Sequence, residues 1–149
     1  MKAMLLAPVL LLSACAGITE HRTGLDEQGQ LYPCPSAPRC VSSQQAAAER
    51  KVEALRLRDR SEAVWQTLIA VLADWPRTEV VEQSGRYVRA EIVSPWRFYT
   101  DDVELLRRSN GLEVDIRSTG RIGYYDFQVN QERVEALRQR WREAGVLAP

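Results

Sequence analysis

The clearest periodic pattern in the chain runs from residue 61 to residue 75. Its apolar positions recur at i, i+4, i+7, i+8 and i+11, the spacing of one helix face. Ser61 suits an N-cap, Glu62 suits the positive end of the helix dipole, and Pro76 ends the pattern. We therefore predict an amphipathic helix that packs on a sheet. Its apolar positions are Val64, Leu68, Val71, Leu72 and Trp75.

Strand patterns follow this helix, marked by alternating apolar and polar side chains. Ser84-Gly85 supplies a turn, and Asn110-Gly111 is a strong signal for a β-hairpin. The region before the helix is ambiguous, because its alanines and charges suit a helix whereas residues 52–57 also suit an extended edge, which we favour. The main strands are expected at residues 78–83, 86–93, 96–107 and 112–117.

A last helix is expected from Asn130, its predicted N-cap, to Gly145. Val134, Leu137 and Trp141 form its apolar stripe. The order helix, antiparallel meander, helix predicts an α+β fold: a two-layer arrangement with a meander sheet of four to five strands and two packing helices. With 149 residues, 45% of them hydrophobic, the chain has enough apolar surface for one domain, which we place at residues 32–149.

The first residues have the pattern of a secretory signal peptide, predicted at residues 1–14. Lys2 precedes the apolar run 3–12, which is too short to span a bilayer. Residues 12–15, Leu-Ser-Ala-Cys, resemble the lipobox of bacterial lipoproteins, in which the cysteine is acylated and becomes the new N-terminus. An ordinary secretory signal with an incidental Cys15 is the alternative.

Lipidation of Cys15 would make the membrane the first partner of this protein, because two or three acyl chains anchor a protein firmly. Residues 15–31 are polar and contain glycines, so we read them as a lipidated tether in which His21 has no role. Ala16, rather than an aspartate, follows Cys15. By resemblance to Gram-negative lipoproteins, this favours the outer membrane, with the domain facing the periplasm.

Charge excludes a nucleic-acid partner. The chain has 20 Lys and Arg against 20 Asp and Glu, and removal of Lys2 with the leader leaves 19 against 20, a net charge of −1. No overall field then attracts a polyanion. Any function must depend on local geometry.

Two cysteines remain if Cys15 is lipidated. Cys34 and Cys40 have five residues between them, and in an oxidising compartment a disulfide would close this loop. The chain-entropy model gives about 2–2.5 kcal/mol for so short a loop. A metal site is disfavoured because there is no second cysteine pair and no nearby histidine. A redox-active pair is the alternative, although the spacing is not Cys-x-x-Cys.

Several segments together carry a family resemblance. They are CPSAPRCVSSQ at 34–44, DDVE at 101–104, RSTGRIGYYD at 117–126 and VNQERV at 129–134. In this order they resemble the bacterial family called domain of unknown function 1499, over about residues 31–137. The resemblance implies no activity, since none is established for the family. Arg39, Gly120 and Phe127-Gln128 depart from the family pattern, whereas the Asp and Arg positions match it.

Acidic and basic residues recur between residues 99 and 133. On neighbouring strands, Asp102 and Glu104 would lie near Asp115 and Arg117 on one face, where arginine–carboxylate pairs form naturally. One hypothesis is a structural latch that holds residues 118–126 against the sheet. Removing one partner of a buried pair would then cost about 3–5 kcal/mol.

A second hypothesis is a binding site for an anionic group on a small ligand or on an envelope protein. Arg117, Arg121 and Arg133 would converge beside Ser118 and the N-terminus of the last helix, where carboxylates or phosphates bind well. The candidate ligand-binding residues are Asp102, Asp115, Arg117, Ser118, Arg121, Asp126, Asn130 and Arg133.

A third hypothesis is a small periplasmic hydrolase with Asp101 and Asp102 as acid and base. Neighbours on a strand point to opposite faces, so the two carboxylates cannot easily reach one substrate atom. The domain also has no Ser-His arrangement, phosphate loop or metal-ligand cluster. We therefore predict a lipid-anchored cell-envelope protein that acts as a non-enzymatic binding or structural module, with no catalytic residue, cofactor or metal.

The aromatic residues near this stretch allow two interpretations. Trp65, Trp75 and Trp141 fall on the predicted helices and are expected to pack in or beside the core. A second group flanks the polar stretch and could either pack or line a groove, and we favour packing. This group consists of Trp96, Phe98, Tyr99, Tyr124 and Tyr125.

Overall fold

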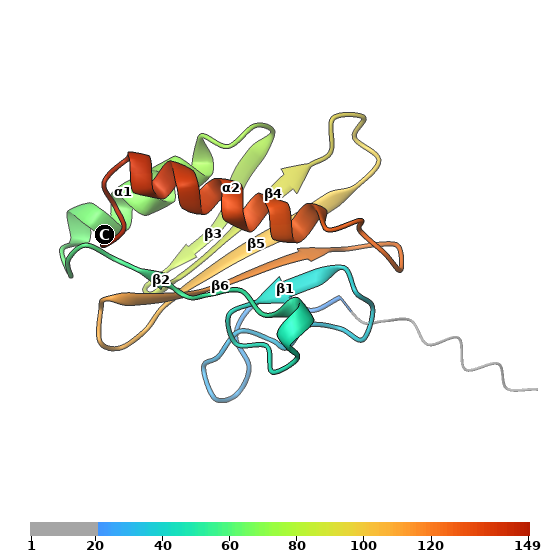
Figure 1. The fold of residues 1–149 in the computed structure, drawn as a ribbon, viewed down its shortest axis with the longest axis horizontal. Helices are drawn as coiled ribbons and strands as arrows, with labels where there is room; N and C mark the ends of the chain where they lie inside the picture. Colours follow the sequence, from blue (N-terminus) through green and yellow to red (C-terminus); the bar gives the residue numbers. More distant parts are fainter. Residues whose placement is uncertain (1–20) are drawn as a thin grey trace, which may run out of the picture.

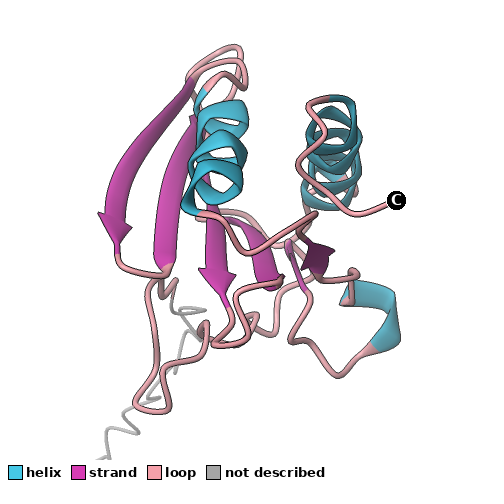
Figure 2. Cartoon of the chain, turned by 90° about the vertical axis from the view of Figure 1, so that its left-hand side faces the viewer, coloured by secondary structure: helices cyan, strands magenta, loops and turns pink. Residues whose placement is uncertain are grey.

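In the computed structural model, residues 21–149 are described and form one six-stranded sheet with two α-helices on the same face (Figures 1 and 2). The predicted signal peptide and Cys15 lie outside the described residues, so the leader and the lipidation stay predictions. Neither α-helix of residues 21–149 combines the length and apolar character needed to cross a membrane.

All neighbouring strands of the sheet are antiparallel, in the order β1-β6-β5-β4-β3, and β2 also pairs with β6. The two-layer α+β prediction is confirmed. The sheet has six strands rather than four to five, because β1, which was not predicted, pairs with β6 beside β2, which lies in the extended segment expected at residues 52–57. The elements are β1 (Cys40–Ser42), a 3-10 helix (Ala48–Arg50), β2 (Leu55–Arg56), α1 (Glu62–Ala73), β3 (Thr78–Ser84), β4 (Tyr87–Val93), β5 (Thr100–Arg107), β6 (Glu113–Gly120) and α2 (Val129–Glu143).

The core lies between the two helices and the sheet. Helix α1 contacts β3 and β4, while α2 contacts β1 and β6. Trp65 and Trp141 are buried between the layers, as predicted, and Nε1 of Trp141 donates a hydrogen bond to the Leu68 carbonyl at 2.9 Å. Leu105 pairs with Ile116 on this buried face. The alternation along β5 and β6 therefore leaves Asp102, Glu104, Asp115 and Arg117 on the opposite, open face.

Local sequence signals set most of the element boundaries. The Ser61 hydroxyl accepts a hydrogen bond from the Val64 amide at 3.3 Å, so Ser61 caps α1 as predicted. Asn110 likewise accepts hydrogen bonds from the amides of Leu112 and Glu113, which fixes the hairpin between β5 and β6.

The predicted start of the third strand at Trp96 is wrong, because β5 begins at Thr100. The Ser94 hydroxyl accepts hydrogen bonds from the amides of Phe98 and Tyr99 and holds a turn at residues 94–99. Arg97 lies in this turn with φ +59°, a conformation that a strand does not contain. Local side-chain bonding therefore replaces the strand here.

The predicted N-cap of the last helix is also wrong. Gln128, with φ +68°, occupies the N-cap, and Asn130 lies inside the first turn of α2. The carboxylate of Asp126 accepts hydrogen bonds from the amides of Gln128 at 3.0 Å and Asn130 at 3.2 Å. This carboxylate satisfies two amides near the helix start, which a capping side chain would otherwise do.

The disulfide between Cys34 and Cys40 is present, as the sequence predicted. The lipidated tether stays a prediction, but its described part, residues 21–31, lies against the open face of the sheet. A bridge joins Leu25 to Leu31, and Leu31 packs with Tyr87 and Leu106 in a small apolar cluster. Residues 21–31 therefore contact the sheet of the domain that was expected to begin at residue 32.

Candidate functional site

The open face of the sheet carries a buried ion pair between Glu104 on β5 and Arg117 on β6. The two residues are direct cross-strand partners, and both side chains are almost fully buried. Glu104 also accepts hydrogen bonds from the Tyr87 hydroxyl and the Gly24 amide, each at 2.7 Å. Burial and the Glu104 charge raise the pKa of Tyr87, so its hydroxyl stays protonated and donates. The pair is thus enclosed by the protein.

Asp102 is the centre of a second cluster on this face. Arg121 contacts its carboxylate at 2.8 and 3.0 Å, Arg89 at 3.0 Å, and Nε2 of His21 at 2.9 Å. Burial alone would raise the pKa of Asp102, but the hydrogen bonds from His21, Arg121 and Arg89 outweigh it, so the pKa falls below its usual range. Arg121 also reaches Glu91 at 2.5 Å. His21, for which we predicted no role, therefore belongs to this cluster.

Asp115 forms a third cluster, near the hairpin between β5 and β6. Arg108 holds its carboxylate through two nitrogens at 2.7 and 2.8 Å, and Ser43 and Gln44 donate to it at 2.7 and 2.9 Å. Burial opposes ionisation, yet these donors lower the pKa of Asp115 below its ordinary value. The sequence did not identify Arg108, because only the hairpin register places it beside Asp115.

The remaining candidates lie on the helix side of the sheet. Arg133 on α2 pairs with Asp101 at 2.7 Å and donates to Asn130 at 2.7 Å and to the Ser118 hydroxyl at 3.2 Å. Ser118 in turn donates to Asn130 at 2.6 Å, and the Asn130 amide group donates to Asp126 at 2.8 Å. These five residues join the end of β6, the start of β5 and the first turn of α2.

The predicted residues therefore form separate groups on the two faces of the sheet. Arg117 and Arg121 lie on the open face, whereas Arg133 lies on the helix side, so the three arginines do not converge. Each is paired with a carboxylate. Ser118 is part of β6 rather than of the predicted loop, which is limited to residues 121–128. On the open face, the Arg121–Asp102 pair joins the start of this loop to β5. The Arg117–Glu104 and Arg108–Asp115 pairs lie within the β5–β6 hairpin instead.

Asp101 and Asp102 also lie on opposite faces, because they are neighbours on β5. Asp101 pairs with Arg133 and Asp102 with Arg121, so the two carboxylates do not face a common space. In the described part of the chain, no group of three or more His, Cys, Asp or Glu side chains is placed to hold a metal ion.

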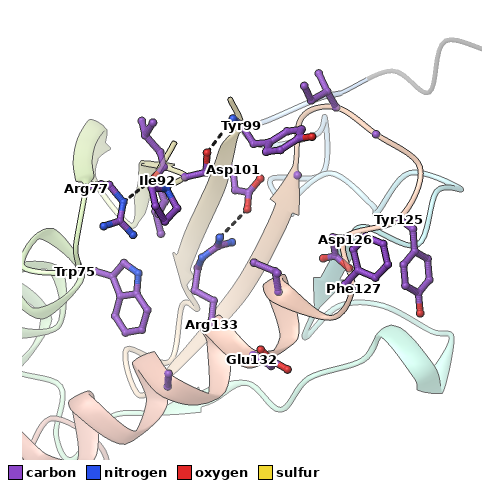
Figure 3. Close-up of a pocket in the computed structure, with 18 residues that line it drawn as sticks. Trp75, Arg77, Ile92, Tyr99, Asp101, Tyr125, Asp126, Phe127, Glu132 and Arg133 are labelled. Carbon is purple, nitrogen blue, oxygen red and sulfur yellow. Dashed lines mark hydrogen bonds and ion pairs between the residues drawn. The ribbon is translucent and has the colours of Figure 1, made fainter. Parts of the chain in front are cut away.

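A groove of about 600 Å³ opens on the helix side, at the end of the sheet where β4 and β6 finish and β5 begins (Figure 3). The Asp101–Arg133 pair lies inside it, Trp75 and Arg77 bound one end, and Phe127 bounds the other. Its lining is mainly apolar, and Ala136 on α2 leaves room along one side.

Arg77 differs from the arginines that the sequence singled out. Its Nε donates to the Val93 carbonyl at 3.0 Å, and no carboxylate among the described residues pairs with it. Arg77 is exposed and lies in the connection between α1 and β3 with φ +56°. The sequence offered no signal for it, because the groove is formed by residues far apart in the chain.

The rim of the groove is formed by residues 94–99 and by residues 121–129, which are the loop after β6 and the first residue of α2. We call these two segments the aromatic loops. Their large apolar side chains are exposed, so the prediction that these aromatics pack is wrong. Trp96 and Phe127 are each 80% exposed. The exposed apolar residues of the aromatic loops are Trp96, Phe98, Tyr99, Ile122, Tyr124, Tyr125, Phe127 and Val129.

A family model described as protein of unknown function (DUF1499) matches residues 30–141. This is the family that the sequence motifs resemble, so that prediction is confirmed. No curated protein matches the chain. No solved structure matches it either.

Proposed function

The chain belongs to the DUF1499 family, whose description assigns no activity, and we propose that it is a lipid-anchored, non-enzymatic binding module of the cell envelope. Cys15 would carry the anchor in the outer membrane, with the domain facing the periplasm. The ligand would be an amphipathic molecule with an anionic group, bound in the groove beside α2. The groove, with Arg77 at one end and apolar side chains at the other, carries this proposal.

The chemistry of the groove selects such a ligand. Its apolar walls favour burial of hydrocarbon, which contributes about 25 cal/mol for each Å² removed from water. Arg77 can donate to an oxyanion without first losing a carboxylate partner. Arg133 already shares its donors among Asp101, Asn130 and Ser118, so it shapes the floor instead of supplying a free cation.

The open-face clusters argue against a ligand site there. Asp102, Glu104 and Arg117 are buried, and their charges are compensated within the domain. We assign them the role of a latch that fastens the N-terminal segment to the sheet through His21 and Gly24. The anionic group, which the sequence predicts beside Arg117, Arg121 and Arg133, is therefore proposed at Arg77.

The test is binding of 1-anilinonaphthalene-8-sulfonate, an apolar anionic probe, followed by its fluorescence. Ala136 is an exposed residue of α2 that lines the groove, so Ala136→Trp should fill the groove. We expect this variant to bind the probe at least about tenfold more weakly, a loss of about 1.4 kcal/mol or more in binding free energy. Glu135→Trp adds the same side chain at the neighbouring position outside the groove. Equal affinity of these two variants would refute the groove as the site.

A second pair of variants tests the charge. Arg77→Gln should also lose about tenfold in affinity, because one charge-assisted contact is removed. Arg86→Gln is the matched control: Arg86 is exposed and donates to a backbone carbonyl, that of Arg107 at 2.8 Å, but lies outside the groove. If turnover of simple esters, phosphates or glycosides were detected, the non-enzymatic part of the proposal would fail.

A further inference from the structure

The exposed apolar surface of the domain is concentrated at one end. Of the ten large apolar side chains exposed among residues 21–149, eight lie on the aromatic loops. The other two, Leu25 and Val81, are only 37% and 38% exposed. Monomeric proteins rarely leave such a cluster in water without a partner. The clustering of exposed apolar side chains therefore indicates that a partner covers this end of the domain.

The described chain begins at the base of the same two loops. His21 contacts Asp102, which lies just after the first loop, and Asp102 contacts Arg121, with which the second loop starts. Figure 1 shows the loops projecting at the end where the coloured chain begins. His21 is six positions after Cys15 in the chain, and a fully extended chain of six residues spans about 20 Å.

We propose that the aromatic loops insert into the interfacial region of the bilayer that carries the lipid anchor. This inference depends on the proposed lipidation of Cys15, which would hold His21 within about 20 Å of the membrane. The groove would then open towards the membrane, and its amphipathic ligand would come from the lipid phase.

The side chains on these loops are those that bind a membrane interface, which makes a bilayer a better partner for them than another protein. Tryptophan and tyrosine concentrate at membrane interfaces, because each has an apolar ring and one polar group. Trp96, Tyr99, Tyr124 and Tyr125 supply four such rings. Arg97, exposed between Trp96 and Phe98, can contact anionic headgroups. The first loop contains no acidic residue that would oppose this contact.

The test uses the full chain, produced with its leader, in vesicles of phosphatidylethanolamine and phosphatidylglycerol with plain or brominated acyl chains. Flotation of the vesicles reports anchoring, and bromine quenching of tryptophan reports insertion. Wild-type protein should float and lose emission in brominated vesicles, because Trp96, one of its four tryptophans, would lie among the brominated chains. Trp96→Phe should float and lose clearly less emission, since only Trp75 beside the groove would remain near the lipid.

The position of the tryptophan supplies the control. In the Trp96→Phe background, Ser84→Trp places a tryptophan on an exposed residue at the other end of β3, where we expect no quenching beyond that of Trp96→Phe. If wild type floats but is quenched no more than Trp96→Phe, the inference is overturned while the anchor stands. If the wild-type chain does not float, both the anchor and the inference fail.

Discussion

The buried Glu104–Arg117 pair supports a quantitative prediction about stability. Arg117→Ala leaves the Glu104 carboxylate inside the protein without its cation, although the Tyr87 hydroxyl and the Gly24 amide still donate to it. Stranding one partner of a buried pair costs about 3–5 kcal/mol. At roughly 4 °C for each kcal/mol in a domain of this size, the melting temperature should fall by about 12–20 °C.

The double variant Glu104→Leu/Arg117→Met separates the cost of a stranded charge from the value of the pair. It removes both charges and keeps apolar volume, an exchange that is often neutral or stabilising. Tyr87 and Gly24 would each lose an acceptor, at about 1 kcal/mol each. We therefore expect the double variant to lose about 2 kcal/mol or less, and to be more stable than Arg117→Ala.

Urea unfolding of the purified protein, followed by circular dichroism, measures these differences. The slope of the transition should stay unchanged, so that a shift of the midpoint reports stability alone. A loss of less than about 1 kcal/mol in Arg117→Ala would refute the reasoning, because such a value suits an exposed pair. A double variant less stable than Arg117→Ala would show that the pair itself, and not charge compensation, stabilises the fold.

Two further predictions concern Asp102 and Asp126. The pKa of Asp102 is lower in the folded state, so the unfolded state binds more protons in acid, and the free energy of unfolding should fall as the pH drops below about 4. Urea titrations at several pH values measure this fall, and Asp102→Asn should make it smaller. Asp126→Ala removes the acceptor at the start of α2 and should cost about 1–2 kcal/mol, whereas an unchanged melting temperature in calorimetry would contradict that role.

Much of the fold could be predicted from the sequence, because its signals are local. The apolar spacing after Ser61, the Asn110-Gly111 turn and the alternation along β5 and β6 each depend on neighbouring residues. Family motifs correctly indicated the family, and the cysteine spacing correctly indicated the disulfide. The errors lie where a side chain forms local hydrogen bonds. The Ser94 hydroxyl holds a turn where a strand start was expected, and the Asp126 carboxylate accepts from the amides near the helix start in place of the expected N-cap.

The candidate site was less predictable. The sequence grouped Arg117, Arg121 and Arg133, but the sheet separates them onto two faces. It gave no signal for Arg77, because the groove that Arg77 borders is completed by residues 92–101 and 120–136 of the chain. It also favoured packing for the aromatics that the structure leaves exposed on two loops. The spacing of residues predicts which face of a strand or helix each one lies on, but it does not predict which distant segments are in contact.

The sequence by itself determined the elements, the alternation of their faces, the family and the disulfide, because each depends on residues close in the chain or on a recognisable order of motifs. Only the tertiary structure decided which charges are compensated and which apolar side chains stay in water. Asp102 receives donors from residues 21, 89 and 121, and the groove combines a helix, three strand ends and three connecting segments. The ion pairs and the groove both arise from contacts between segments that are distant in the chain, so they cannot be predicted from the spacing of residues along the sequence.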